Sequence, residues 1–158
     1  MVQLRGDAKQ RYVSDMFSSI SQRYDLMNNL MTMGMHRKWK LQTANITATG
    51  LSGFALDIAS GTGDLALELG RIPDLTTVVG LDLIPEMVDL ARIKVIQQSQ
   101  YYKTSMVLGD ALSLPFSDDT FSCATAGFSL RNMPALSCLL YTSDAADEGL
   151  GVDLGGRR

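Results

Sequence analysis

Apolar positions near the start of the chain recur at steps of three and four, the spacing of one face of an α-helix. The positions that form this stripe are Val13, Met16, Phe17, Ile20, Tyr24, Met27 and Met31. A second helical pattern runs from Trp39 to Thr49 and is followed by Gly50, a residue type that often ends helices. The pattern predicts that residues 1–50 form a helical region, distinct from the rest of the chain.

Beyond residue 50, short runs of apolar and β-branched residues alternate with helical segments. The runs cover residues 54–58, 77–81, 105–108 and 121–126, and helical patterns at 64–71 and 85–98 separate the first three. Such alternation is typical of βαβ units, which build a parallel sheet with helices on its faces. We therefore expect an α/β domain over residues 51–136, with helices on both faces of the sheet.

The last segment, residues 137–158, has a different character. Its sequence, SCLLYTSDAADEGLGVDLGGRR, loses periodicity and ends in a glycine-rich run of mixed charge. No strand in it could extend the sheet. We expect this segment to be either a disordered tail or unrelated residues joined at a truncation.

Composition and charge narrow the class of protein. With 46% hydrophobic and 20% charged residues, the 158-residue chain has the composition of a globular domain, and its net charge of -3 gives no basic stripe for nucleic acid. It shows neither an apolar run of membrane-spanning length nor the core of a signal peptide, so we expect a cytoplasmic protein. Cys123, Cys138 and the single histidine, His36, lack the spacing of metal ligands, so we expect two buried thiols and no metal site.

The stretch ALDIASGTGDLALEL, residues 55–69, places a glycine-rich turn between the first strand and a helix. In parallel α/β sheets a ligand binds at this turn, so Gly61, Thr62 and Gly63 are candidate binding residues. The string also fits the loose dinucleotide pattern, so an oxidoreductase is an alternative. However, Asp57 and Asp64 on either side would repel a pyrophosphate, whereas a ligand with a cationic group and a ribose, such as S-adenosyl-L-methionine, suits them.

Two further acids follow the next two strands. Asp82 ends the second strand, where a carboxylate can accept hydrogen bonds from ribose hydroxyls, and Asp110 follows the third. An adenine could donate its exocyclic amine to Asp110, while the backbone N–H of Ala111 serves a ring nitrogen. Each acid alone could be a solvated loop residue or a helix cap. Three acids at successive strand ends favour a binding site.

Three stretches together resemble a known family. They are MFSSISQRYDLMNNLMTMGMHRKWK; ALDIASGTGDLALEL with VVGLDLIPEMVDLAR; and GDALSLPFSDDTFSCATAGFSLRNM. From about Val13 to Pro134 the chain is similar to the ubiquinone/menaquinone biosynthesis C-methyltransferases, a branch of the class I methyltransferases. Ala59 stands where broader methyltransferases often have the first loop glycine. The resemblance implies a Rossmann-like fold with an N-terminal helical lid, and S-adenosyl-L-methionine as the cofactor.

The same resemblance implies the reaction and its participants. The reaction is methyl transfer to a ring carbon of a prenylated quinol, either demethylmenaquinol or a methoxy-benzoquinol, and candidates for handling the quinol hydroxyl are Arg131, His36 and Tyr24. Each has an alternative: an ion pair for Arg131, a structural hydrogen bond for His36, and packing for Tyr24.

Five of the nine methionines lie between residues 16 and 35, and they either pack in the core, the interpretation we favour, or receive the prenyl chain. Such a substrate implies transient contact with the inner face of a membrane.

Family members continue beyond the Leu-Arg-Asn segment through further strands, which the resemblance implies are missing here. We therefore expect a C-terminally truncated chain with an incomplete sheet. An inactive fragment that binds S-adenosyl-L-methionine, or another small-molecule methyltransferase, is the alternative. The sequence leaves the oligomeric state open.

Overall fold

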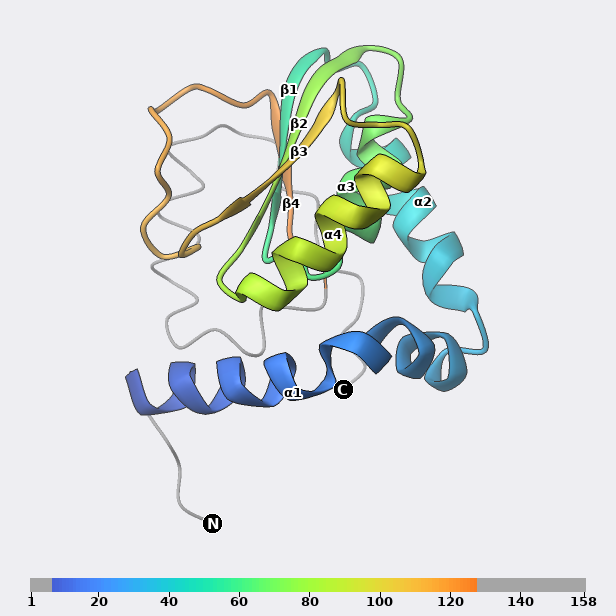
Figure 1. Cartoon of the computed structure of the whole chain (residues 1–158). Helices are drawn as coiled ribbons and strands as arrows, with labels where there is room; N and C mark the ends of the chain where they lie inside the picture. The colour runs from blue at the N-terminus through green and yellow to red at the C-terminus, as the bar shows by residue number, and fades with distance from the viewer. Residues whose placement is uncertain (1–6, 128–158) are drawn as a thin grey trace, which may run out of the picture.

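The computed structural model describes residues 7–127 and contains eight helices and strands within that range (Figure 1). Their bounds are α1 Asp7–Met31, α2 Met35–Thr47, β1 Gly53–Ile58, α3 Asp64–Gly70, β2 Leu75–Asp82, α4 Pro85–Gln97, β3 Thr104–Leu108 and β4 Cys123–Thr125. The expected order of helices and strands is confirmed, although β4 is shorter than the run that predicted it. Arg131, Cys138 and the segment from residue 137 lie outside the described residues.

The four strands form one parallel sheet in the order β3-β2-β1-β4. The first strand in the chain, β1, is therefore flanked on both sides, by β2 and by β4. Asp57 of β1 lies opposite Gly80 on β2 and Thr125 on β4, while Asp82 at the end of β2 lies opposite Leu108 on β3. Because the strands are parallel, their carboxyl ends meet at one edge of the sheet.

Helices α2, α3 and α4 lie on one face of the sheet, and the segment 109–122 lies on the other (Figure 1). Among residues 7–127, the helices that connect the strands therefore lie on one face of the sheet. The handedness rule explains the arrangement: β1 to β2 and β2 to β3 step in the same direction, so their right-handed crossovers place α3 and α4 on the same face. The step from β3 back to β4 reverses direction, so its connection crosses the opposite face, here without a helix.

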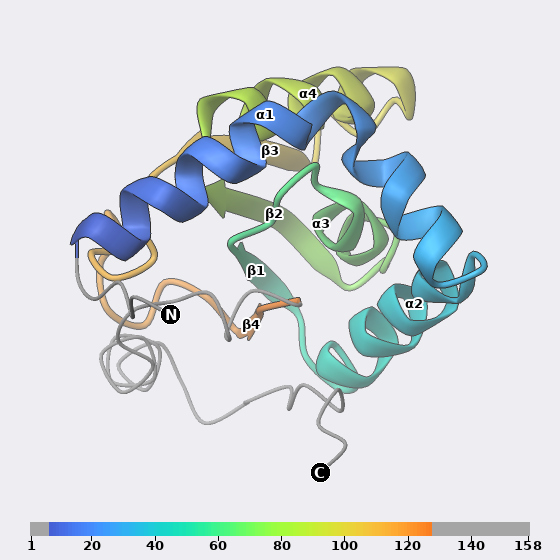
Figure 2. The same ribbon diagram turned by 90° about the horizontal axis from the view of Figure 1, so that it is seen from below.

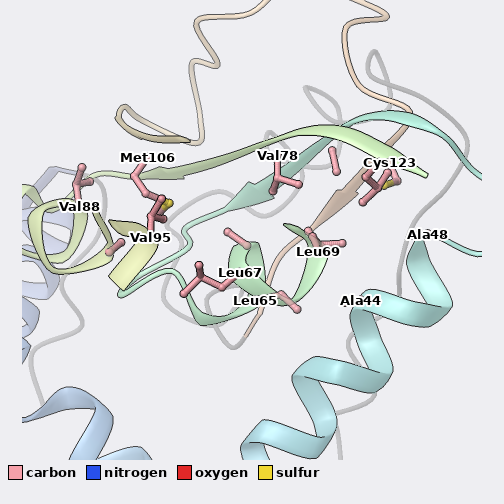
Figure 3. Close-up of a cluster of buried hydrophobic side chains, with 14 residues drawn as sticks. Ala44, Ala48, Leu65, Leu67, Leu69, Val78, Val88, Val95, Met106 and Cys123 are labelled. Atoms are coloured by element: carbon pink, nitrogen blue, oxygen red, sulfur yellow. The ribbon is translucent and has the colours of Figure 1, made fainter. Parts of the chain in front are cut away.

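Each face of the sheet buries its own apolar cluster. On the helical face, small residues of α2 and aliphatic residues of α3 and α4 pack on the strands (Figure 3). On the other face, Leu56, Ile58 and Leu81 pack against Phe121 and the partly buried apolar residues of segment 109–122. Cys123 on β4 is buried in the first cluster and is a free thiol, as expected for this cysteine.

Helix α1 crosses the sheet at its carboxyl edge, where β2 leads into α4 (Figures 1 and 2). A turn at residues 32–34, with Gly34 in the left-handed region at φ 78°, then redirects the chain into α2. The methionines at this bend point outward: Met31 and Met33 are 78% and 82% exposed, and Met27 and Met35 are also exposed. Core packing, the favoured interpretation of this methionine stripe, is therefore wrong for these four residues.

Candidate functional site

The three acids singled out in the sequence come together along the carboxyl edge of the sheet. Asp57 belongs to β1, Asp82 ends β2, and Asp110 follows β3 by two residues. Strand order β3-β2-β1 therefore lines them up in the order Asp110, Asp82, Asp57. The turn between β1 and α3, residues 59–63, lies at the same edge, since the amide of Ser60 donates to the carbonyl of Leu81 at 3.0 Å.

The backbone of this turn takes three residues into the left-handed region. They are Ala59 at φ 52°, Gly61 at φ 56° and Gly63 at φ 81°. Glycine adopts this conformation at little cost, whereas an alanine there is strained. Ala59, which stands where methyltransferases more often have a glycine, thus has a backbone conformation that favours glycine.

Asp57 is the most deeply buried acid of the site, with 1% of its surface exposed. Its Oδ1 accepts a hydrogen bond from the hydroxyl of Thr125 at 2.8 Å, and its Oδ2 has no hydrogen-bond partner of normal geometry among the described residues. Burial raises its pKa to about 7, although Thr125, the charge of Lys40 and the amide of Ala66 favour the ionised form. The site thus contains a buried carboxyl group with one oxygen unused.

Asp82 is buried but well hydrogen-bonded. One carboxylate oxygen accepts the amide of Gly61 at 2.6 Å, and the other accepts the amide of Ile84 at 3.0 Å. Burial raises its pKa, and the backbone amides of Ile84, Gly61 and Leu83 oppose that rise. Since a carboxylate offers about four acceptor positions, Asp82 retains capacity for a ligand hydroxyl while fixing the turn to the start of α4.

Asp110 and Ala111 form the third part of the edge. The carboxylate of Asp110 accepts the amide of Leu112 at 2.9 Å, which fixes the chain as it leaves β3. The side chain of Ala111 is buried in the cluster of the second face, against the sheet. These contacts place the acid and the following amide beside the end of β2.

Asp64, at the start of α3, is not the unpaired acid that the sequence led us to expect. Its carboxylate accepts from Lys40 at 2.8 Å and from Lys94 at 2.6 Å. Burial acts to raise its pKa, but the two lysines outweigh burial, so the pKa lies below its ordinary value. The expectation that Asp64 stands unpaired beside the ligand is therefore wrong, and the acids left to repel a pyrophosphate or attract a cationic group are Asp57 and Asp82.

Tyr24 and Thr62 connect α1 with the turn. Cε1 of Tyr24 lies 4.0 Å from the position that an added Cβ would take at Gly61, so the ring lies beside this glycine. The hydroxyl of Thr62 donates to Asp25 on α1 at 2.6 Å. Tyr24 also makes an edge contact with Phe17, with ring centroids 5.8 Å apart.

His36 is buried at the start of α2. Its Nδ1 lies 2.8 Å from the hydroxyl of Thr32, and burial together with Lys40 and Arg37 lowers its pKa. These are the surroundings of a structural histidine, and a role in proton transfer stays a prediction. The described residues contain no group of three potential metal ligands.

Four residues of this site were not identified from the sequence: Asp25, Lys40, Lys94 and Thr125. Each reaches the site from a different element, at a sequence separation of 24 or more from its partner. Three of them lie in the family-like stretches, Asp25 and Lys40 in the first and Thr125 in the third, whereas Lys94 lies outside all three.

Gly63 offers a direct test of the packing behind the turn. A Cβ added there would lie 2.9 Å from the Cβ of Ala91 on α4, whereas one added at Gly50, with a similar φ of 74°, would meet nothing within 4 Å. Gly63→Ala should therefore destabilise the chain by about 1–3 kcal/mol more than Gly50→Ala, since both share the backbone strain and only the first adds overpacking. Urea unfolding of both variants measures the difference, and equal losses would contradict the close α3–α4 contact.

The sheet order, the glycine-rich turn and the acidic carboxyl edge define a Rossmann-like domain of the methyltransferase type. Solved structures of the same fold include a protein assigned as an S-adenosyl-L-methionine-dependent methyltransferase from Methanococcus maripaludis, with a TM-score of 0.65 and 15% identity over 94% of this chain and 64% of that one. The methyltransferase in the Trm112 complex of Haloferax volcanii has a TM-score of 0.65 and 21% identity, over 86% and 56% respectively.

Sequence comparison then identifies the family. The chain belongs to the ubiE/COQ5 methyltransferase family, whose model matches residues 5–143. It is 42% identical over 128 residues to a demethylmenaquinone methyltransferase of Roseiflexus castenholzii, covering 80% of this chain and 52% of the relative. It is 38% identical over 119 residues to a ubiquinone/menaquinone biosynthesis C-methyltransferase of Citrifermentans bemidjiense, covering 75% and 51%. The chain thus spans about half the length of the curated relatives it matches.

Proposed function

We propose that this chain carries the S-adenosyl-L-methionine site and the N-terminal lid of a C-methyltransferase that acts on a prenylated quinol. Its family consists of methyltransferases that depend on this cofactor. The observation that carries the cofactor assignment is the acidic edge, where Asp57, Asp82 and Asp110 lie at or just beyond the carboxyl ends of three neighbouring strands. The prenylated quinol is proposed as the substrate because of the names of two relatives, each of which matches this chain over about half of its own length.

The residues at the edge fit the chemical groups of this cofactor. Two buried oxygen atoms, Oδ2 of Asp57 and Oγ of Ser60, have no hydrogen-bond partner of normal geometry among the described residues. A buried polar atom left unpaired costs free energy, so a ligand that donates hydrogen bonds would relieve that cost. We assign Asp57 to the ammonium group, Asp82 to the ribose hydroxyls, and Asp110 with the Ala111 amide to the adenine.

The cofactor would supply an electrophilic methyl group, and the chain's own residues would position the two reactants. Gly61, Thr62 and Gly63 allow close approach to the backbone, and Tyr24 on α1 lies against the same turn. Holding both reactants in a near-attack geometry can lower a barrier by about 7–11 kcal/mol. For the quinol hydroxyl, we propose that Arg131, which lies outside the described residues, stabilises the phenolate or orients a water, with His36 and Tyr24 as the other candidates for handling this group.

Calorimetric titration with S-adenosylhomocysteine tests whether this chain holds the cofactor site. Micromolar or tighter binding supports the proposal, and absence of binding leaves the chain as a silent fragment. NADH fluorescence is the matched control, because a saturable enhancement would support the oxidoreductase alternative.

Methyl transfer to short-chain demethylmenaquinol and to the matching methoxy-benzoquinol then tests the substrate. A ratio of kcat/KM above about 10⁴ would indicate a dedicated polar contact with one head group.

We further propose that the bend between α1 and α2 contacts the membrane surface that holds the prenylated substrate. No helix among residues 7–127 has the length and hydropathy to cross a membrane. The bend nevertheless exposes several large apolar side chains, with Leu30 at 79% and Met33 at 82%. The sequence has no acid between Asp25 and Asp57 and carries Arg37 and Lys38 in exposed positions beside the apolar residues. Apolar side chains next to cations favour an anionic lipid surface.

Co-sedimentation with vesicles tests this contact. We expect the chain to bind vesicles that contain phosphatidylglycerol more strongly than pure phosphatidylcholine vesicles. Since each cation near the surface contributes about 1 kcal/mol, Arg37→Gln with Lys38→Gln should weaken binding about 30-fold. Arg71→Gln with Arg92→Gln removes the same charge from exposed positions elsewhere and should have little effect. Equal loss in both double variants would show that net charge alone governs binding.

A further inference from the structure

A single carboxylate on α1 bonds to two other elements at the carboxyl edge of the sheet. One oxygen of Asp25 accepts the hydroxyl of Thr62 in the turn at 2.6 Å, and the other lies 2.5 Å from the ammonium of Lys94 on α4. Thr62 is buried, and the side chain of Asp25 is 44% exposed. Asp25 therefore lies at the boundary between the solvent and the turn.

Lys94 is fully engaged by this arrangement. Besides Asp25, its ammonium donates to Thr62 at 2.9 Å and to Asp64 at 2.6 Å. A lysine has three N–H donors, so these three acceptors use all of them. Asp64 is paired in turn with Lys40 of α2. The two acids and two lysines balance in charge and join α1, α2, α3 and α4 around the turn.

Two other contacts hold α1 over the same edge. The ring of Tyr24 lies beside Gly61, and the side chain of Ser18 hydrogen-bonds to Glu86 in the first turn of α4, which lowers the pKa of that acid. Of these contacts, the one through Asp25 bonds directly to a side chain of the turn. A movement of α1 away from the edge would therefore release Thr62 and leave Lys94 short of one acceptor.

We infer that Asp25 is a positioning residue of the cofactor site: it fastens α1 to the turn through Thr62 and Lys94, and this contact must open for the cofactor to leave. The inference depends on the proposed binding of S-adenosyl-L-methionine at this edge. The arrangement couples the lid to the turn in both directions. Docking of α1 orders residues 61–64, and an ordered turn presents Thr62 to α1.

Dissociation kinetics of S-adenosylhomocysteine test the inference. Asp25→Ala should raise the dissociation rate about tenfold or more, with a much smaller change in the association rate, because the closed state loses its fastening. Asp25→Glu keeps a carboxylate and should restore most of the slow dissociation. Asp15→Asn removes a charge from an exposed position on the same helix and should leave both rates unchanged. Equal dissociation rates for Asp25→Ala and wild type would overturn the inference.

Hydrogen exchange in the ligand-free chain separates this inference from the proposed function. In Asp25→Ala, amides of both the turn and α1 should exchange faster than in Asp15→Asn, while amides of β1 and β2 stay protected. Unchanged exchange in the turn would refute the positioning role, whether or not the chain binds the cofactor. If the wild-type chain shows no binding while the turn and α1 loosen together, the proposed function fails and the fastening stands.

Discussion

Asp57→Asn should weaken cofactor binding by about 2–5 kcal/mol, the scale for removing one partner of a buried charge pair. The variant keeps an oxygen that accepts from Thr125 but has no negative charge to offer an ammonium group. In the wild type, binding should tighten as the pH rises from 5.5 to 7.5, by up to about tenfold per unit, because burial raises the pKa of Asp57 to about 7. In the variant this pH dependence should vanish.

The same substitution should stabilise the ligand-free chain. In the unfolded chain Asp57 ionises near its ordinary pKa of 3.8, and in the folded chain near 7. The stability that this raised pKa provides is present below about pH 4 and is lost as the pH rises to 7. At pH 8, Asp57→Asn should therefore be about 1–3 kcal/mol more stable than wild type.

Urea unfolding at pH 5 and pH 8 measures this effect, with Asp89→Asn on the exposed side of α4 as the control. A variant that loses stability at pH 8 would show that ionised Asp57 is stabilised by contacts beyond those described. Calorimetric titration at the same pH values measures binding independently. Undiminished affinity in Asp57→Asn would remove this residue from the ammonium group.

Asp82→Asn should weaken binding by about 1.5–3 kcal/mol, the usual scale for a hydrogen bond to a charged group. It should also destabilise the ligand-free chain by about 1–3 kcal/mol. Both carboxylate oxygens accept backbone amides, those of Gly61 and Ile84, and an asparagine offers only one oxygen to them. The two substitutions should therefore differ in sign: Asp57→Asn removes a buried charge and keeps its acceptor for Thr125, whereas Asp82→Asn leaves a backbone amide without its acceptor.

A ligand without ribose hydroxyls separates the two effects of Asp82. Wild type should prefer S-adenosylhomocysteine over its 2′,3′-dideoxy analogue, and Asp82→Asn should lose most of that preference. If the variant retains it in full, Asp82 orders the turn without touching the ribose. The thermal midpoint without ligand reports the structural part independently.

The fold could be predicted from the sequence because its signals are local. The strand before Asp57 and the helix after Pro85 are each indicated by residues close together in the sequence, and the parallel sheet follows from their alternation. The acids at the strand ends were located correctly for the same reason, since each lies within two residues of the end of a strand. That residues 109–122 cover the second face without a helix could not be predicted, because the rule for crossovers fixes the face that a connection crosses but not its secondary structure.

Charge pairing at the site could not be predicted, because it depends on contacts between distant segments. Asp64 looked like an unpaired acid beside the turn, but its partners Lys40 and Lys94 lie 24 and 30 residues away in the sequence. The exposed methionines were misjudged for a related reason. Helical spacing shows which face of a helix carries the methionines, but whether another element packs on that face depends on the bend at Gly34.

The position of β1 between β2 and β4 has a consequence for synthesis on the ribosome. Thr125 is made 68 residues after Asp57, which at about 5–20 residues per second leaves one side of β1 unpaired for about 3–14 s. During that interval Asp57 lacks Thr125 and its covering strand, so it stays hydrated and ionised. An inward-facing charge on an open strand edge discourages pairing with other nascent chains. The carboxyl group proposed to bind the cofactor would thus first protect the newly made sheet from aggregation.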